Sequence, residues 1–505
     1  MKKLFTLLFA AASAFVAHAT DYNVPITVIV NGVTSEQKGV ITVDETDGLY
    51  NLTVKNFVLQ SENGPMGVGN VALQNIESFK DGDATLLMAN RQVTITDGDD
   101  PAVSFWMAAM LPPVPVELRG KIEDNHLRCY LDINLTDVLQ QVITVAIGDG
   151  WQMPNQSFEA WHTSTGNYVE PNGWHSFESA TGSLAPLAGH HIEKSDDAHT
   201  GEASARIYAT SIFGIVANGT MTTGRMNAGS MAAADAANHA YLDMSQTEFD
   251  GNGDPYYIPL YACPDSLALW VKFNQGKPSA DHPYATVSAV ITDGTHYQDP
   301  EDKEYTNVVA KAKNAQIAVT GDKWVRLSIP FVRTGLNVDP QAALITISTN
   351  ADAGQGGAGD EVLVDDIEFV YNAKVTGLKV KGQDVADFAA DKSDYEMELN
   401  LTVTADDIEV ATNGSTAHVL KSVTTEEDYY VCNITVISAD MSAISSYVVR
   451  VKSSATAISE TVADAAPATR RPALYTLDGR RAATLTPGRV YISRKADGTT
   501  LKVIR

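Results

Sequence analysis

Short segments in which apolar and polar residues alternate recur along this chain and predict β-strands. They are rich in Val, Ile, Thr and aromatic residues, and turn-forming residues separate them. The clearest segments are residues 27–31, 49–59, 267–273, 324–331 and 362–371. Helical periodicity is scarce, and its best example is the Ala-rich segment 230–239. We therefore predict an all-β protein.

The chain is too long for one hydrophobic core. Its 505 residues correspond to about three or four domains at roughly 150 residues per domain. We expect a signal peptide at 1–19, β-rich modules at 21–148, 149–373 and 374–453, a linker rich in Ala, Ser and Thr at 454–472, and a short β segment at 473–505.

The N-terminus predicts export. Two lysines, an apolar stretch over residues 4–16 and the small-residue motif Ala17-His18-Ala19 are typical of a secretory signal that is cleaved after Ala19. Thr20 and Asp21 follow without a lipobox cysteine, which argues against a lipid anchor. No other segment approaches the ~20 apolar residues of a membrane span. We expect a secreted protein or one at the outer cell surface.

The charge of the chain excludes some partners. A formal net charge of −26 repels nucleic acid and anionic membranes. Residues 456–505 differ, because they carry seven Arg and two Lys against four acidic residues, which marks the tail as a separate unit. Cys129, Cys263 and Cys432 lie far apart, so we expect buried apolar side chains at these positions and no disulfide framework.

The first module resembles a known family. Asn56-Phe57, Val68-Gly69-Asn70-Val71 and Gly120-Lys121-Ile122 are similar to residues of calycin-like domains from exported proteins of Bacteroidota. The resemblance implies a small β-barrel over residues 21–148. Such a barrel either holds a small hydrophobic ligand or is filled by its own side chains.

The second module gives the most extended resemblance. Phe158-Glu159-x-Trp161, Gly173-Trp174, the turn at 198–207, the strand 269–273 and Val364-Asp365-Asp366-Ile367 resemble the "putative carbohydrate metabolism domain" family. That family is a jelly roll related to carbohydrate-binding modules. The resemblance implies that residues 149–373 bind an oligosaccharide or polysaccharide without catalysis.

The two remaining modules resemble accessory domains. Residues 374–453 are similar to the cadherin-like or immunoglobulin-like β-sandwich spacers of surface carbohydrate-active proteins. Residues 473–505, with Tyr475, Asp478-Gly479-Arg480 and Pro487-Gly488, resemble the C-terminal sorting domains read by the type IX secretion machinery. The alternative for this short tail is a β-hairpin extension with no sorting role.

A calcium site is expected where the ends of the second module meet. Calcium takes six to eight oxygen ligands. In related jelly-roll modules the Glu after Phe and an Asp of the closing pair supply them, which implicates Glu159, Asp365 and Asp366 here, together with Glu202 and carbonyl groups of the turn at 199–202. Asp365 and Asp366 are adjacent on a strand and should point to opposite faces. The alternative is that backbone amides or water satisfy these carboxylates.

Exposed aromatic rings are the candidate sugar platforms, because the apolar face of a pyranose stacks on a ring. Trp161, Tyr168, Tyr256 and Tyr257 lie in turn-rich segments beside Asn and Asp, so we assign them to carbohydrate binding. Trp270 and Trp324 lie within alternating strands and are expected in the core.

Other motifs give weaker signals. The segment from Asp250 to Asp254 offers alternate oxygens but fails the EF-hand pattern, so a plain turn is expected. His190, His191 and His199 match no zinc spacing and are expected at the surface or in turns. No catalytic motif is found, so binding is favoured over a jelly-roll glycoside hydrolase or polysaccharide lyase. A structural surface or adhesin component, or a carrier of a small hydrophobic ligand, stays open.

Overall fold

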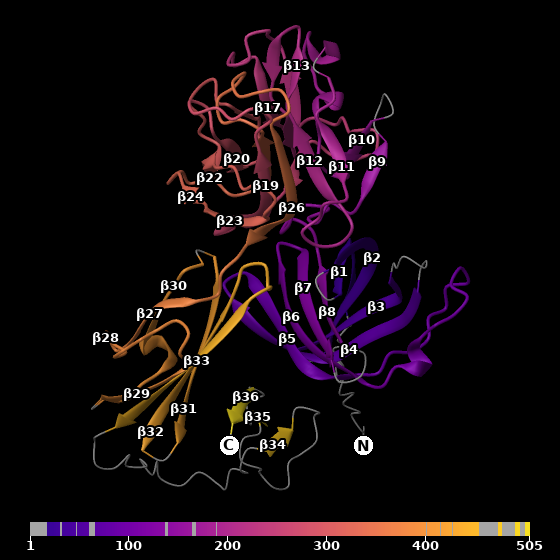
Figure 1. Ribbon diagram of the computed structural model, residues 1–505. Helices are drawn as coiled ribbons and strands as arrows, with labels where there is room; N and C mark the ends of the chain where they lie inside the picture. Colours follow the sequence, from indigo (N-terminus) through magenta and orange to yellow (C-terminus); the bar gives the residue numbers. More distant parts are fainter. Residues whose placement is uncertain are drawn as a thin grey trace, which may run out of the picture. The chain divides into compact units, whose positions relative to one another are not determined.

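A computed structural model of the chain describes residues 18–453 almost continuously and three short strands beyond them (Figure 1). Up to residue 453, the residues that it does not describe are 1–17, 31–32, 47, 60–65, 137–139, 164–167, 188, 400, 415 and 427. Most of the expected signal peptide and the whole linker at 454–472 therefore lie outside the described residues. The described elements are almost all strands, which confirms the all-β prediction.

The first eight strands pair in sequence order and close into a barrel. The strands are β1 (His18–Val30), β2 (Val33–Thr46), β3 (Leu49–Leu59), β4 (Met66–Asp81), β5 (Ala84–Val93), β6 (Val114–Glu123), β7 (His126–Leu135) and β8 (Gln141–Ile147). Alternation sets the inward face, because Leu52 and Val54 of β3 are buried while their neighbours are more exposed.

Two sheets of the second module share one core. The five-stranded sheet has the order β11 (Ile192–Ser195), β12 (Ser204–Tyr208), β26 (Glu361–Val370), β19 (Ser266–Asn274), β23 (Val325–Pro330). The second sheet has the order β15 (Thr220–Thr222), β25 (Ala342–Ser348), β20 (Ala285–Thr292), β22 (Val308–Ile317), β24 (Val332–Arg333), and β18 (Ile258–Pro259) pairs with β25. Leu269, Phe273 and Val364 from the first sheet and Val287 and Ile345 from the second are buried together, which defines a β-sandwich.

Smaller elements surround this sandwich. They are the pairs β9 (Trp161–Thr163) with β10 (Val169–Pro171) and β13 (Thr210–Ile212) with β14 (Ile215–Ala217), the sheet β16 (Arg225–Ala228), β17 (Asn238–Leu242), β21 (Tyr297–Asp299), and the 3₁₀ turns η2 (Phe177–Ser179) and η3 (Ala185–Leu187). The Ala-rich segment with helical periodicity forms turns and then enters β17. The Asn238 side chain holds these turns by accepting the amide of Ser230.

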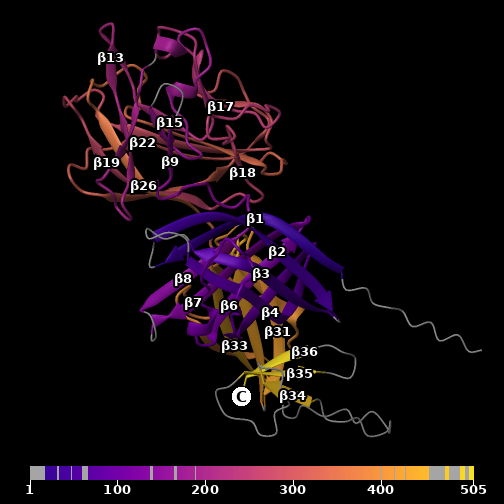
Figure 2. The ribbon, with the colours of Figure 1, turned by 90° about the vertical axis from the view of Figure 1, so that its right-hand side faces the viewer.

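The start of the second module runs along its last strand, β26. The amide of Ile367 donates to the carbonyl of Gln156 at 3.0 Å. The Gln152 side chain accepts the amide of Phe369 at 2.8 Å and donates to its carbonyl at 2.6 Å. These contacts join residues more than 200 positions apart in the sequence, as the sandwich prediction requires. Figure 2 shows β9, β19, β22 and β26 from a second direction.

The third module is a smaller β-sandwich. One sheet has the order β28 (Gln383–Asp384), β27 (Val375–Val380), β30 (Ile408–Thr412), and the other β29 (Asp394–Leu399), β33 (Ile444–Ser453), β32 (Tyr429–Ile437), β31 (His418–Glu426). Strands β29 and β33 pair in parallel, and the other pairs are antiparallel. Leu378 and Ile408 from the first sheet and Cys432 and Val449 from the second share one apolar core.

The tail contains three antiparallel strands, β34 (Ala473–Thr476), β35 (Val490–Arg494) and β36 (Thr500–Ile504). Outside the second module, the described residues also form the 3₁₀ turns η1 (Ala108–Met110) and η4 (Ala405–Asp407). Over the described part of the chain, none of the helices has the length and apolar composition that a membrane crossing needs.

Candidate functional site

Two adjacent carboxylates of β26 hold the turn between β11 and β12. Asp365 Oδ2 accepts the backbone amides of His199 at 2.7 Å and of Thr200 at 3.2 Å. Asp366 meets the same residues, because Thr200 Oγ1 donates to its Oδ1 at 2.6 Å and His199 Nδ1 lies 2.5 Å from its Oδ2. The two side chains were expected on opposite faces. A bulge against β19 and a φ of 44° at Asp366 bring both to one turn instead.

Glu159 holds the other half of this turn. Its Oε1 accepts the amides of Glu202 at 3.0 Å and of Ala203 at 3.2 Å. Gly201 lies between the two halves with φ +66°, and a Cβ there would come within 2.0 Å of Glu159 Oε1. The structure thus gathers Glu159 and the Asp365-Asp366 pair around one turn. Glu202 contributes its backbone amide to this arrangement while the residue itself is exposed.

Backbone amides already satisfy much of the charge at this turn. Asp365 is fully buried, and its Oδ1 accepts the amide of Asp366 at 2.8 Å. Burial and the Asp366 carboxylate raise the pKa of Asp365 to about 7, although the three amide hydrogen bonds act in the opposite direction. This geometry matches carboxylates capped by backbone amides. Calcium at the turn stays a prediction.

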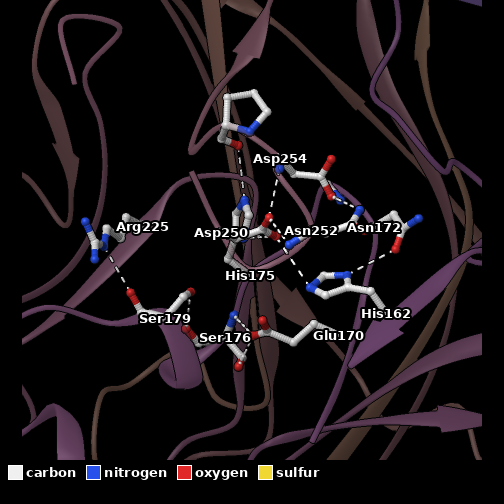
Figure 3. Close-up of polar contacts among 12 residues, drawn as sticks. His162, Glu170, Asn172, His175, Ser176, Ser179, Arg225, Asp250, Asn252 and Asp254 are labelled. Atoms are coloured by element: carbon white, nitrogen blue, oxygen red, sulfur yellow. Dashed lines mark hydrogen bonds and ion pairs between the residues drawn. The ribbon is translucent and has the colours of Figure 1, made fainter. Parts of the chain in front are cut away.

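A polar cavity of about 230 Å³ opens elsewhere in the second module. Its lining comes from β10, η2, β16 and the segment before β18, so residues far apart in sequence meet there. The lining residues are Glu170, Glu178, Ser179, Ala180, Arg225, Phe249, Asp250, Gly251 and Tyr256. Figure 3 shows Glu170, Ser179, Arg225 and Asp250 around this region.

Two glutamates and Asp250 give the cavity its acidic side. Glu170 is 1% exposed, and its Oε1 accepts both the hydroxyl and the backbone amide of Ser176, the latter at 2.8 Å. Burial raises the pKa of Glu170. Burial and the nearby charge of Glu170 raise the pKa of Glu178, whose Oε1 lies 3.4 Å from His190 Nδ1. The cavity therefore offers strong hydrogen-bond acceptors in a partly desolvated setting.

A guanidinium group and aromatic rings form another part of the lining. The Arg225 guanidinium lies 4.7 Å from the centre of the Tyr256 ring. Its Nε donates to the carbonyl of Ser179 at 3.0 Å, and its Nη1 pairs with Glu248. Phe249 remains 58% exposed, although an apolar ring of this size is usually buried. A flat apolar surface therefore lies beside charged donors and acceptors.

The structure separates the four aromatic candidates. Tyr256 lines the cavity. Tyr168 is 44% exposed and stacks on His190, with ring centres 4.1 Å apart, so it is linked to the lining through the His190–Glu178 contact. Trp161 and Tyr257 are partly buried and pack against apolar clusters.

The two tryptophans expected in the core are half-buried. Leu269 and Val271 of β19 belong to the core, so Trp270 between them faces the opposite side of the sheet. Its ring stacks on His199 at 3.8 Å. Trp324 meets His199 edge-on at 6.1 Å. These rings therefore cover the turn that Asp365 and Asp366 hold.

The segment from Asp250 to Asp254 forms a turn, as predicted. Asp250 Oδ1 accepts the amides of Asn252 at 2.9 Å and of Asp254 at 2.8 Å. This turn joins Phe249 to Tyr256, so it shapes the cavity wall.

The histidines that the sequence grouped lie in different surroundings. His190 stacks on Tyr168 and His199 stacks on Trp270. His191 was expected at the surface or in a turn, but it is fully buried, and its Nδ1 lies 2.9 Å from the carbonyl of Tyr208. Burial there follows from its position directly before β11, where it packs edge-on against Phe177.

Sequence reasoning missed Glu170, Glu178, Arg225 and Phe249. None belongs to a motif, and their meeting depends on how β10, η2 and β16 are arranged. The one usable signal was Phe249 itself, a large aromatic residue directly before a polar turn.

Comparison with known proteins bears mainly on the first module. The family model described as "Calycin-like beta-barrel domain" matches residues 19–147, which confirms the resemblance for that part of the chain. No curated protein matches the chain in sequence.

Among solved structures, the crystal structure of a "putative glycoside hydrolase" from Bacteroides thetaiotaomicron is similar at 14% sequence identity and a TM-score of 0.34. The likeness covers 58% of this chain and 98% of that chain. A TM-score this low carries no inference about this chain.

Proposed function

We propose that this chain is a non-catalytic glycan-binding protein and that the cavity around Arg225 and Glu170 is its binding site. One observation carries the proposal: the exposed ring of Phe249 lies at a cavity that also presents a buried carboxylate and a guanidinium group. Sugars combine an apolar ring face with several hydroxyls. They are held by an aromatic surface together with charged hydrogen-bonding groups.

The size of the cavity favours a small part of a glycan. A volume of about 230 Å³ is below the roughly 300–1,000 Å³ of pockets that enclose whole drug-sized ligands. A single residue at a chain end, or one side branch, fits this size. Tyr168 stacks on His190, which lies beside Glu178 of the cavity lining. Its ring would extend the contact along the glycan.

Two arginines of the second module provide a matched test. Arg225 stacks over Tyr256 and pairs with Glu248, whereas Arg206 stacks over Tyr208 at 4.8 Å and pairs with Glu193 at 2.7 Å. The full chain and the variants Arg225→Gln and Arg206→Gln should be applied to a glycan array. We expect binding by the wild type and by Arg206→Gln, and at least a tenfold loss for Arg225→Gln. Equal binding by all three proteins would refute the assigned site.

Calcium belongs to this proposal as a structural ion at the turn held by Glu159, Asp365 and Asp366. There it would stiffen the sandwich without touching the glycan. The array should be repeated in calcium and in chelator. Calcium is refuted for this turn if neither binding nor melting temperature of the wild type responds to it.

Glycoside hydrolysis is the second candidate function, and the raised pKa of Glu178 favours it. Its raised pKa beside Glu170 is the property that a general acid needs. Glycans that bind on the array should be incubated with the protein, and new reducing ends should be measured. Release that disappears in Glu178→Gln would establish hydrolysis. Binding without release would leave the non-catalytic function.

Export is proposed from the sequence of residues 1–19 and of the tail at 473–505. In cells of the source organism, the protein should occur in the medium or at the outer surface with Thr20 as its first residue. Sorting by type IX secretion machinery predicts that deletion of 473–505 leaves the protein in the periplasm. N-terminal mass spectrometry and cell fractionation check both expectations. Retention of Met1 would refute export by a cleaved signal.

A further inference from the structure

Two buried histidines converge on one carboxylate oxygen beneath the turn at 250–254. His162 Nε2 and His175 Nδ1 each lie 3.5 Å from Asp250 Oδ2 (Figure 3). The three side chains are 10%, 0% and 2% exposed, respectively. Among the described residues, none of these three atoms has a hydrogen-bond partner. Unsatisfied polar atoms at such depth are costly.

Two other histidine–aspartate pairs of the same module are closer, whereas His296 Nδ1 lies 3.9 Å from Asp243 Oδ2. His199 Nδ1 lies 2.5 Å from Asp366 Oδ2, and His282 Nδ1 lies 2.8 Å from Asp352 Oδ2. Both are hydrogen-bonding distances. At 3.5 Å, neither imidazole around Asp250 donates a hydrogen bond to the carboxylate.

The second nitrogen of each ring determines where its proton lies. His175 Nε2 is 3.1 Å from the carbonyl oxygen of Pro255, which can only accept, so Nε2 carries the proton. His162 Nδ1 is 3.0 Å from Asn172 Oδ1, which likewise accepts. In these tautomers the lone pairs of His162 Nε2 and His175 Nδ1 face Asp250 Oδ2.

A metal ion explains acceptor nitrogens that approach a carboxylate oxygen without a hydrogen bond. Ligands about 2.1 Å from a tetrahedral ion lie about 3.4 Å from each other, close to the two distances of 3.5 Å. Metal-bound histidines typically donate their other N–H to a carbonyl or carboxylate oxygen, as both rings do here with oxygen acceptors.

The surrounding groups complete such a site. A carboxylate oxygen of Asp254 lies within 4.8 Å of the ligand atoms of His162 and Asp250. Asp254 is oriented by the amide of Gly173, which donates to its Oδ2 at 2.8 Å. Asp250 is oriented through its other oxygen, which accepts the amide of Asn252.

We propose that His162, Asp250 and Asp254, whose ligand atoms all lie within 4.8 Å of one another, bind one divalent transition-metal ion of the zinc class, with His175 beside them at 3.5 Å from Asp250. Imidazole nitrogens select such ions, whereas calcium and magnesium prefer sites made of oxygen alone. The ion is therefore distinct from the calcium expected at the turn of Glu159.

The ion has a structural consequence for the cavity. It links β9 through His162 to the turn through Asp250 and Asp254. That turn joins Phe249 to Tyr256, both of which line the cavity. Metal binding therefore fixes one cavity wall, whichever ligand the cavity takes.

The test uses the full chain without a polyhistidine tag, stripped with chelator and titrated with ZnCl₂ in a calorimeter. We expect one tight zinc site per chain. His162→Gln and Asp250→Asn should each weaken zinc binding at least tenfold. His282→Gln is the matched control, because it removes a histidine from a hydrogen-bonded aspartate pair, and it should bind zinc as the wild type does.

A spectroscopic measurement on the wild type covers the case of a variant that fails to fold. Cobalt(II) should produce the visible absorption of a four- or five-coordinate ion. X-ray absorption of the zinc-loaded protein should show an imidazole ligand at about 2.0–2.1 Å together with carboxylate oxygens. Absence of a stoichiometric site in the wild type, a shell made only of oxygen, or unchanged zinc affinity in folded His162→Gln would each overturn the proposal.

Discussion

Asp365 accepts the backbone amide of His199 at 2.7 Å, although 166 residues separate the two in sequence. The contact joins the last strand of the second module to a turn near its beginning. Glu159 holds the same turn from the other half, through the amides of Glu202 and Ala203. Three carboxylates thus position one turn: Asp365 and Glu159 accept its backbone amides, and Asp366 contacts the side chains of His199 and Thr200.

Replacement of Gly201 should test how much Glu159 contributes. An added methyl group would lie 2.0 Å from Glu159 Oε1, in a backbone with φ +66°. Glu159 would have to turn away and lose its two amide hydrogen bonds. We expect Gly201→Ala to lower the free energy of unfolding of this module by roughly 2–4 kcal/mol, from backbone strain and lost hydrogen bonds together.

Gly321→Ala is the control for backbone strain. Gly321 has nearly the same φ, +63°, and no atom lies within 4 Å of the position that an added methyl group would take. Its cost should be about 1 kcal/mol. Chemical denaturation of both variants measures the difference. Equal destabilisation would show that the Glu159 contact adds nothing.

The stability that Asp365 contributes should fall as pH rises from about 4 to about 7. Its pKa is raised to about 7 in the folded protein and is about 3.9 in the unfolded chain. The contribution is fully present below the unfolded value and is lost as pH passes through the folded value. We expect the unfolding free energy of the wild type, relative to Asp365→Asn, to decrease by roughly 1–3 kcal/mol over this range.

Calcium would change the sign of this pH effect, because an ion at the turn favours the ionised carboxylate. Melting curves of both proteins at pH 4, 5.5, 7 and 8, with calcium and with chelator, measure it. If the stability difference between the wild type and Asp365→Asn is the same at all pH values in chelator, the raised pKa of Asp365 is contradicted. If the stability of the wild type relative to Asp365→Asn increases with pH in calcium but not in chelator, calcium at the turn is supported.

Removal of the Phe249 ring should weaken glycan binding and leave the fold intact. The side chain is 58% exposed, so Phe249→Ala should change stability by less than about 1 kcal/mol. Loss of one stacking ring should reduce affinity about 5- to 30-fold. Phe213→Ala serves as control, because Phe213 is 81% exposed and is not among the cavity-lining residues. A glycan that binds both variants equally well would exclude stacking on Phe249.

The three cysteines should not react with thiol reagents in the folded protein. All are free and buried, as the sequence predicted. Burial raises the pKa of Cys129 to about 12 and those of Cys263 and Cys432 to about 11, so the reactive thiolate is scarce at neutral pH. Mass spectrometry after maleimide treatment should find labels only once denaturant is present. Rapid labelling of any one cysteine in buffer would contradict its burial.

Local pattern was enough to predict the strands, because alternation follows from the sequence. The barrel and the gathering of Glu159 with Asp365 were predicted from the family resemblances of the first two modules. Local pattern was not enough for the directions of Asp365 and Asp366, because a single residue with positive φ at a bulge redirects both side chains. Local pattern also could not predict that His162 and His175 approach Asp250. Those residues come from three segments, and no fixed spacing relates them.

The closed ring of strands β1 to β8 bears on how copies of this protein can crowd together. A sheet with open sides presents unpaired amide and carbonyl groups that can recruit a strand from a neighbouring molecule and begin aggregation. A closed barrel has no edge strands, so this part of the chain tolerates dense packing without intermolecular strand exchange.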